Sequence, residues 1–335
     1  MKVDAIKSNT LNIGKFDMKS FFRKYVLECI LLILIIFLTV SQSGFLTVPN
    51  LFNILRNMSL QGVIAFGMTI VIISGEIDLS VGSTVGLTGV IIAVLTGSLA
   101  KHGIPMEYGV LIGIAVALIV AALIGLFSGY LLTVIKMPSF IITLGLYTLV
   151  FGIAGVICKG FQIITLPEWF GEIGSGQIFG VIPIPAVILL VVFAIVFILM
   201  NYMKFGRSIY AVGGNVESAR LSGVNVKFVK TAALVIVQVL AALGGILESS
   251  LVMSGNYLYG RDWAMTVISA AIIGGTSIFG GVGKVWGTLM GLIFIGVIQN
   301  GMVLMNIGES EQYITKGGLI VFAVLINTLQ TRQKK

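Results

Sequence analysis

The sequence predicts an all-α, polytopic integral membrane protein with about ten transmembrane helices. Of its 335 residues, 57% are hydrophobic and 10% are charged, whereas soluble domains are roughly 45–50% apolar and about 25% charged. Apolar runs close to the roughly 20 residues that a helix needs to cross a bilayer recur along the chain. Basic residues gather beside these runs, as they do in membrane proteins. These observations argue against a soluble fold.

Ten apolar runs, bounded by Gly, Pro, Asn or charged residues, are the predicted membrane-spanning helices. They lie at 25–42, 52–74, 79–100, 108–134, 139–158, 181–202, 229–252, 263–279, 285–306 and 313–329. Together they define one transmembrane domain at 25–329, with an N-terminal arm at 1–24 and a tail at 330–335. No small-residue cleavage site follows the first run, so the arm and this run are interpreted as an arm and an anchor, not as a signal peptide.

The 21 basic residues predict the orientation in the membrane, because Lys and Arg resist translocation and collect in cytoplasmic segments. They cluster in the arm, in the connection at 203–228 and in the tail. If the arm is cytoplasmic, ten crossings return the tail to the cytoplasm and place 203–228 there too. The net charge of +8 is then explained by basic residues that face membrane lipid. No nucleic-acid partner is expected.

Few residues could hold a metal ion. Cys29 and Cys158 lie in separate apolar runs, and His102 is the only histidine. These spacings fit neither a disulfide framework nor a zinc site. We therefore expect no metal and no cofactor bound by this chain.

A polar break at 74–83 separates the second and third predicted helices and contains Glu76 and Asp78 without any Lys or Arg. Irregular backbone at membrane depth is tolerated only where protein or water in a cavity satisfies its polar groups. Three roles are open for the two acids. They could line a substrate path, cap the following helix, because carboxylates favour helix N-termini, or bind a proton or cation.

Glycine spacing predicts close helix packing, because small residues four apart let helix backbones approach. Such pairs occur at Gly82/Gly86, Gly109/Gly113, Gly125/Gly129 and Gly287/Gly291. A second Gly-rich break, at 274–283, follows an apolar run just as the first break does. Transporters are often built from repeats with broken helices near the substrate path, so the two breaks are predicted to play corresponding roles.

The connection at 203–228 contains a predicted short helix. Asn215 can cap a helix that begins near Val216, and Gly223 can end it. A capped helix on the cytoplasmic face can dock into a groove of a partner protein. The alternative is an amphipathic loop that is only solvated.

No motif for ATP hydrolysis or other catalysis occurs in the chain. Gly283-Lys284 and Gly14-Lys15 are each followed by an apolar residue, so neither supplies the Ser or Thr with which a phosphate-binding loop holds magnesium. Neither G-x-S-x-G nor H-E-x-x-H is present. The chain is predicted to be neither an ATPase nor another enzyme.

Three segments together resemble the permease subunits of ATP-binding-cassette (ABC) importers for ribose, galactose, xylose and related sugars, including the autoinducer-2 signal. They are SGEIDLSVGS at 74–83, GRSIYAVGGN at 206–215 and GGTSIFGGVG at 274–283, in the family's order. The resemblance covers the chain from about Leu31 to Thr328. Glu217 and the residues that follow are also similar to the family's coupling signature, with Ser218 in place of the central alanine.

The resemblance implies a type II ABC-importer-like permease for a monosaccharide or sugar-like solute, in a prokaryotic inner membrane. Implied partners are a second permease copy or a paralogue, a cytoplasmic ABC ATPase that binds ATP and magnesium, and an extracytoplasmic solute-binding protein. The expected ATPase-coupling residues are Asn215, Glu217, Ala219, Arg220 and Gly223. The candidate residues of the translocation path are Asp78, Ser80, Ser83, Thr276 and Ser277. Glu76, where family members often carry Gly, is the candidate specificity residue.

Two alternatives stay open. A permease of the same architecture could carry a nucleoside or an amino acid, and the neighbouring genes would discriminate. An ion- or proton-coupled secondary transporter would work without an ATPase, and its transport would be lost when Asp78 is neutralised. The lack of further acids or histidines suited to a proton relay disfavours the second alternative.

Overall fold

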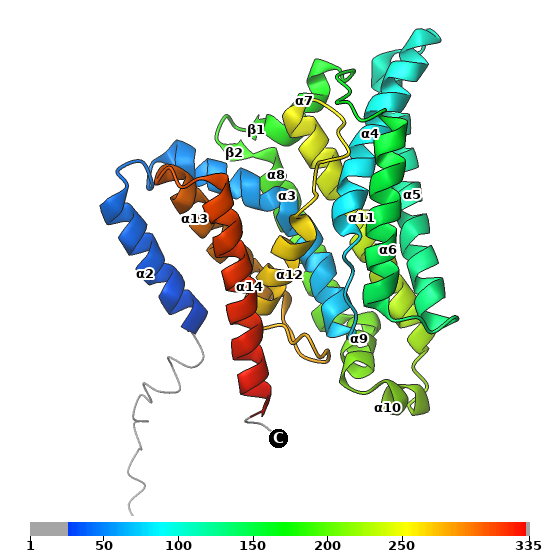
Figure 1. Cartoon of the computed structure of the whole chain (residues 1–335), viewed down its shortest axis with the longest axis vertical. Coiled ribbons are helices and arrows are strands. Elements are labelled where there is room, and N and C mark those ends of the chain that lie inside the picture. The colour runs from blue at the N-terminus through cyan, green and yellow to red at the C-terminus, as the bar shows by residue number, and fades with distance from the viewer. Residues whose placement is uncertain (1–25, 333–335) are drawn as a thin grey trace, which may run out of the picture.

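The computed structural model describes residues 26–332 as a bundle of helices (Figure 1). The predicted arm at 1–24 lies outside the described residues, as do the last three residues of the predicted tail. Each of the ten predicted runs overlaps one helix. These are α2 (Val26–Ser41), α3 (Val48–Ile73), α4 (Val81–Lys101), α5 (Met106–Thr133), α6 (Ser139–Ile157), α8 (Ile184–Tyr202), α11 (Val226–Val252), α12 (Trp263–Ile273), α13 (Val285–Leu304) and α14 (Glu309–Arg332).

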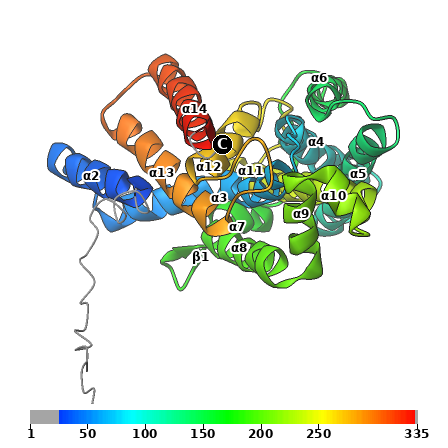
Figure 2. The same ribbon diagram turned by 90° about the horizontal axis from the view of Figure 1, so that it is seen from below.

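Shorter elements connect these helices. They are α7 (Glu168–Ser175), the strands β1 (Gln177–Ile178) and β2 (Ile182–Pro183), α9 (Lys204–Gly214) and α10 (Val216–Leu221). The two strands pair antiparallel, with Gln177 opposite Pro183. Figure 1 shows α7 and the hairpin at one end of the bundle and α9 and α10 at the other, and Figure 2 views the molecule from the α9–α10 end.

Seven of the described helices are long and apolar enough to cross a membrane, namely α3, α4, α5, α6, α8, α11 and α13. By contrast, α2 has 16 residues and α12 has 11, fewer than the roughly 20 that a crossing needs. The all-α, multi-pass architecture is therefore confirmed, apart from the small hairpin. The count of about ten crossings stays a prediction.

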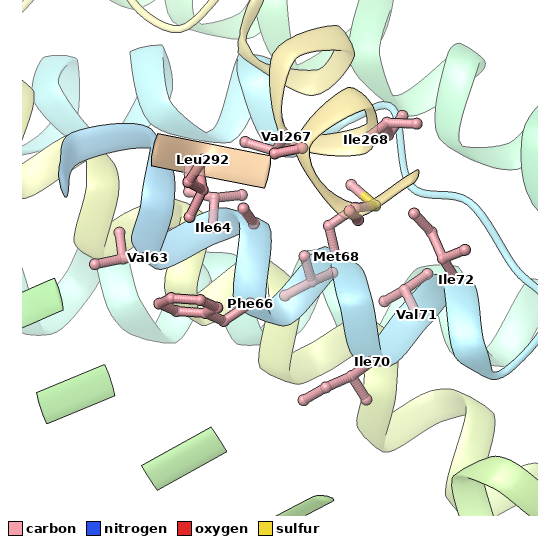
Figure 3. Close-up of a cluster of buried hydrophobic side chains, with 14 of the residues drawn as sticks. Val63, Ile64, Phe66, Met68, Ile70, Val71, Ile72, Val267, Ile268 and Leu292 are labelled. Carbon is pink, nitrogen blue, oxygen red and sulfur yellow. The ribbon is translucent and has the colours of Figure 1, made fainter. Parts of the chain in front are cut away.

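Helix α3 forms the centre of the hydrophobic core. Every residue at 62–73 is buried. Figure 3 shows side chains of this stretch, among them Phe66 and Met68, beside Val267 of α12 and Leu292 of α13. A helix that is apolar on all sides must be enclosed by other helices, and α8, α11, α12 and α13 enclose α3.

The outer helices keep apolar side chains on the surface. Ile119 of α5, Phe140 of α6 and Ile195 of α8 are all more than half exposed. Contiguous apolar surface of this kind is uncommon on soluble monomers. On a multi-pass protein it is the surface that faces lipid.

All four predicted glycine pairs are packing sites. In α5, Gly113 lies against the backbone of α4 at Ile92, and Gly125 lies against the backbone of α11 at Val235. The remaining pairs also meet backbone atoms of neighbouring segments, Gly82/Gly86 those of 257–261 and Gly287/Gly291 those of 270–274. The glycines are therefore needed for close approach, as the spacing predicts.

Candidate functional site

Helix α10 has the ends that the sequence predicts. The Asn215 side chain accepts a hydrogen bond of 2.8 Å from the backbone N–H of Ser218, as an N-cap residue does. Gly223 adopts a φ of +80° directly after the helix, and Val224 donates its N–H to the carbonyl of Ala219. Ala219 is buried, so it faces the protein. The predicted short helix and its caps are confirmed.

The other face of α10 is open. Glu217 and Arg220 form an ion pair of 2.6 Å with both side chains largely exposed, and the hydrogen bond and charge of Arg220 lower the pKa of the Glu217 carboxyl. Val216 and Leu221 are also exposed, Leu221 to 76%. Exposed ion pairs contribute little to stability. This face of α10 therefore presents charged and apolar side chains that contribute little to the stability of the fold.

The three Gly-rich segments that the sequence analysis singles out meet at one place. Gly281 donates its backbone N–H to the carbonyl of Ile73 at 2.8 Å. A Cβ on Gly213 would overlap that carbonyl oxygen, and a Cβ on Gly280 would lie 2.8 Å from the oxygen of Gly213 and 3.0 Å from the Cα of Gly75. We call these five residues the glycine junction. It joins α9 to the ends of α3 and α12.

A side chain adds to this connection. The Tyr210 hydroxyl of α9 donates to the carbonyl of Gly283 at 2.9 Å, and burial raises the pKa of this phenol. Ile209 and Val212, on the same helix, are fully buried. Helix α9 is thus held against both breaks by backbone, side-chain and apolar contacts.

The two breaks begin with the same helix cap. Gly75 has a φ of +84° and Gly275 a φ of +90°. In each case the glycine N–H and the next N–H bond to carbonyls of the last helical turn, Glu76 to Val71 and Thr276 to Ala271. This is the Schellman arrangement, which requires a left-handed residue and therefore favours glycine. The correspondence of the two caps supports corresponding roles.

Glu76 has a partner that the sequence did not suggest. Its carboxylate forms an ion pair with Lys230, near the start of α11, and both side chains are mostly buried. This contact connects the first break to the helix that follows α10. Glu76 is therefore occupied by a protein cation.

Asp78 lies at the centre of a closed polar network. Its Oδ1 accepts hydrogen bonds from the backbone N–H and the hydroxyl of Ser80, at 2.8 and 2.6 Å, and its Oδ2 accepts one of 2.8 Å from Gln238 of α11. Gln238 also donates to Ser80 and accepts from Thr84. All four side chains are buried. Of the three roles open for Asp78, this geometry favours the structural one, since buried polar groups must be paired.

The remaining candidate path residues lie in similar surroundings. Ser83 is buried and donates to the carbonyl of Ser80 at 2.9 Å. Thr276 is buried, and Ser277 is half-buried and receives a hydrogen bond from the N–H of Phe279. Four of the five candidates, Asp78, Ser80, Ser83 and Thr276, are at most 1% exposed. The path-lining role of these residues stays a prediction without geometric support.

Sequence reasoning missed the residues that tie the breaks to the bundle. Gln238 is a single amide within a long apolar run, and such a residue is often a hydrogen-bonding site in a membrane helix. The hydroxyls of Thr69 and Thr288 lie 2.6 Å apart and join α3 to α13. Gln238 could have been found from its isolation, whereas the threonine pair, 219 residues apart, could not.

Comparison with known proteins identifies what this architecture is. The model of a family described as branched-chain amino acid transport system / permease component matches residues 50–326. The chain belongs to this permease family. The matched region holds both breaks, α9, α10 and the glycine junction, so the family assignment covers the whole site.

Curated relatives of the permease family match along most of their length. The ribose import permease protein of Escherichia coli (strain K12) is 36% identical over 89% of this chain and 91% of its own. The galactose/methyl galactoside import permease protein of Salmonella typhimurium is 34% identical over 93% and 95%. The xylose transport system permease protein of Haemophilus influenzae is 31% identical over 91% and 96%. No solved structure matches this permease.

Proposed function

We propose that the chain is the transmembrane permease subunit of an ATP-driven, binding-protein-dependent importer of a monosaccharide or sugar-like solute. The observation that carries this proposal is the similarity to ribose, galactose and xylose permeases along nearly their whole lengths. The family description names branched-chain amino acids, but these relatives are named for sugars. A sugar is therefore favoured over an amino acid or a nucleoside.

The proposed importer needs partners that this chain does not supply. A cytoplasmic ABC ATPase would bind ATP and magnesium, an extracytoplasmic binding protein would deliver the sugar, and a second permease copy would complete the membrane unit. The permease itself would have no ATPase site and no cofactor. It would lie in the inner membrane of a prokaryote, with both termini and 203–228 in the cytoplasm, because the basic residues cluster there.

Helix α10 is the proposed contact with the ATPase. Its exposed apolar residue Leu221, beside the Glu217–Arg220 ion pair, fits the helix-in-groove mode of recognition. Asn215 and Gly223 would fix the length and angle of the helix. The buried Ala219 would anchor it to the permease.

The glycine junction is the proposed connection between the ATPase and the breaks in the membrane. A movement of α10 by the ATPase would also move α9. The ends of α3 and α12 would then move too, because their backbone atoms contact α9 directly, with no side chain between them. ATP can shift the permease between two states only through its different affinity for them. The glycine junction would connect the ATPase-bound helix α10, through α9, to the helices of the membrane bundle.

Reconstitution tests the proposal. The chain would be placed in proteoliposomes with the ATPase and the binding protein encoded beside it, and uptake of labelled sugar and ATP hydrolysis would be measured together. Glu217→Ala is the coupling variant. Glu107→Ala, an exposed acid in the first turn of α5, is its matched control.

The expected result is uptake that requires both ATP and the binding protein. We expect Glu217→Ala to reduce uptake and stimulated ATP hydrolysis, and Glu107→Ala to reduce neither. Uptake by the chain alone, driven by an ion gradient, would overturn the proposal and favour a secondary transporter. Uptake of an amino acid in place of a sugar would leave the importer mechanism standing and correct the substrate.

A further inference from the structure

The β1–β2 hairpin, at residues 177–183, carries an apolar tip on the surface of the bundle. Phe179 is 93% exposed, and Val181 and Ile182 beside it are 47% and 42% exposed. Only the base of the hairpin is packed, where Pro183 is buried and β2 lies against α3 and α8. A two-stranded hairpin is marginal in water by itself. The contacts at the base therefore position the hairpin and leave its tip uncovered.

The backbone at the tip makes a phenylalanine there unusual. Phe179 has a φ of +54° and Gly180 a φ of +67°, and the Val181 N–H donates to the carbonyl of Ile178 at 3.2 Å. Hairpin turns with positive φ favour Asn, Asp and Gly, and a bulky residue in this region is an outlier. Neither backbone preference nor packing within the described chain accounts for Phe179. An outlier of this kind points to a function.

The length of α8 gives the depth of the hairpin. Helix α8 follows the hairpin directly and has 19 residues. At 1.5 Å per residue these extend over about 28 Å, close to the roughly 30 Å of the hydrocarbon core. The far end of α8 carries the exposed Tyr202, and Lys204 follows. Aromatic and basic residues gather at membrane interfaces, so the hairpin, at the opposite end of α8, lies at the other interface.

A cation lies at the same level as the base of the hairpin. Arg56 of α3 is half-buried, and its guanidinium donates to the carbonyl of Ser175, two residues before β1, at 3.5 Å. Long basic side chains in membrane proteins reach to the interface, where their charge is hydrated. The position of Arg56 therefore agrees with the depth that the length of α8 gives.

The tip adjoins the lipid-facing surface of α8. Figure 1 shows the hairpin at the same end as α7, and Figure 2 shows it at the edge of the bundle beside α8. The exposed side chains that follow on α8 include Leu190 and Val191. No charged residue occurs at 173–203. The hairpin therefore extends the apolar surface of α8 sideways at the level of the interface.

Lipid fits this tip better than a protein that binds and dissociates. A soluble partner would leave Phe179, Val181 and Ile182 in water each time it left, and contiguous apolar surface is uncommon on proteins that face water. Interfaces between soluble proteins also have a polar rim, whereas the nearest charge before the tip is Glu172 of α7. Lipid, by contrast, would cover the tip in every state of the protein.

We propose that the tip of the β1–β2 hairpin is a membrane anchor that inserts between the lipid headgroups of the nearer leaflet. This is the outer leaflet in the orientation proposed above. Phe179 is the main contact, because an aromatic side chain buries a large apolar area. The anchor also holds α7, which leads directly into β1 and packs through Gly174 against the backbone of α11 at Leu251. The inference requires only that the chain spans a membrane, and it goes beyond the proposed transport function.

Spin labelling of the full-length permease in lipid vesicles tests the anchor. In a background of Cys29→Ala and Cys158→Ala, a nitroxide is attached at Phe179→Cys, and the protein is reconstituted in vesicles of phosphatidylcholine and phosphatidylglycerol. Collisions of the label with oxygen, which concentrates in the bilayer, are compared with collisions with a water-soluble nickel chelate. Glu168→Cys, at an exposed position of α7, is the water-facing control, and Ile195→Cys, on α8, is the lipid-facing control.

We expect the label at position 179 to favour oxygen over the nickel chelate several-fold, as at position 195, and the label at position 168 to show the reverse. Strong access of the nickel chelate at position 179 would overturn the anchor, since the tip would then lie in water. Low access of both reagents would also overturn it, because protein would then cover the tip. None of these measurements involves sugar, ATP or another protein, so failure here is distinguishable from failure of the proposed function.

A second label tests the phenylalanine itself and replaces the first if Phe179→Cys does not fold. The label is placed at Val181→Cys, and Phe179→Asn is compared with Phe179→Leu. Asparagine suits positive φ better than leucine does, so a purely structural role would make Phe179→Asn the milder change. We expect Phe179→Asn to lower the oxygen-to-nickel ratio at position 181 several-fold and Phe179→Leu to leave it near the value with Phe179. An unchanged ratio in both variants would overturn the role of Phe179.

Discussion

Two aspartates, one in the first break and one directly before α12, lie in opposite surroundings. Asp78 is fully buried, and both of its oxygens accept hydrogen bonds from the breaks and from α11. Asp262 is exposed, and its carboxylate accepts a hydrogen bond from Tyr313 of α14. A buried carboxylate must be paired within the protein, whereas an exposed one can also be hydrated. Burial and partners therefore separate the two aspartates.

The same contrast separates the glycine junction from the cavity between α12 and α14, whose lining includes Asp262 and Tyr313. At the junction, backbone meets backbone and no side chain fits between the segments. At the cavity, side chains of α12 and α14 leave a space of about 180 Å³, and Ile314 and Val321 of α14 are exposed. The first region is close-packed backbone, whereas the second has open space between its helices. Four experiments would break or sharpen this comparison.

The largest effect is expected at the junction, from Gly213→Ala. The new Cβ would overlap the carbonyl oxygen of Ile73, so α9 must move away and the bond from Gly281 is lost. We expect a destabilisation of about 3 kcal/mol, measured by SDS-induced unfolding in mixed micelles, together with loss of ATP-driven uptake.

Its control is Gly214→Ala, one residue further. A Cβ on Gly214 meets no atom within 4 Å, and alanine is the better helix former by roughly 0.5–1 kcal/mol. Unchanged or slightly raised stability is therefore expected. Equal losses at both positions would show that close approach at Gly213 is not what holds the junction.

The second experiment compares the two aspartates directly. Asp78→Asn removes the charge and places an amide N–H₂ in the position of one of the two oxygens that accept hydrogen bonds, so we expect a loss of about 2 kcal/mol in unfolding free energy. Asp262→Asn should leave stability unchanged, because this carboxylate is exposed. Equal unfolding free energies for the two variants would contradict the distinction between a structural and an accessible aspartate.

The third experiment measures the ion pair between Glu76 and Lys230. A double-mutant cycle with Glu76→Gln and Lys230→Met isolates their interaction from other effects of each substitution. Because both side chains are mostly buried, we expect a coupling free energy of about 1 kcal/mol. A coupling free energy of zero, measured by SDS-induced unfolding, would show that Lys230 does not hold Glu76. Glu76 would then again be a candidate specificity residue.

The smallest effect is expected from Tyr210→Phe. This change removes only the hydroxyl that donates to Gly283, so the expected loss is about 0.5–1 kcal/mol. If α9 transmits motion through this bond, the ratio of sugar imported to ATP hydrolysed should also fall. The control is Phe161→Tyr, which adds a hydroxyl to an exposed ring and should leave the ratio of sugar imported to ATP hydrolysed unchanged. An equal fall of this ratio in both variants would contradict a specific role for the Tyr210 hydroxyl.

Local sequence patterns were sufficient where the physics is local. The apolar runs predicted the long helices because the length and hydropathy of a membrane-spanning helix are properties of one continuous segment. The Asn215 cap and the Gly223 stop depend on a few adjacent residues, and the structure has both. The Gly-rich breaks were recognisable because a helix ends where glycine adopts positive φ.

Residue roles in the path were not predictable in this way. Asp78 and Ser80 were chosen because they are polar residues between apolar runs, but Gln238, 160 residues from Asp78, satisfies them. Asp262 is not among the candidate path residues, because in the sequence it is one of two adjacent charges, with Arg261, before a predicted helix. Its hydrogen bond from Tyr313 of α14 follows only from the tertiary structure.

The sequence by itself determined the membrane class, the helices, the breaks and the capped helix α10, because hydrophobic length, glycine conformation and capping act within one segment. Only the tertiary structure decided that three distant glycine segments form one junction, that Lys230 pairs with Glu76, and that Asp262 meets Tyr313 of α14. These are contacts between segments up to about 200 residues apart, and a pattern in one segment carries no record of which other segment will lie against it.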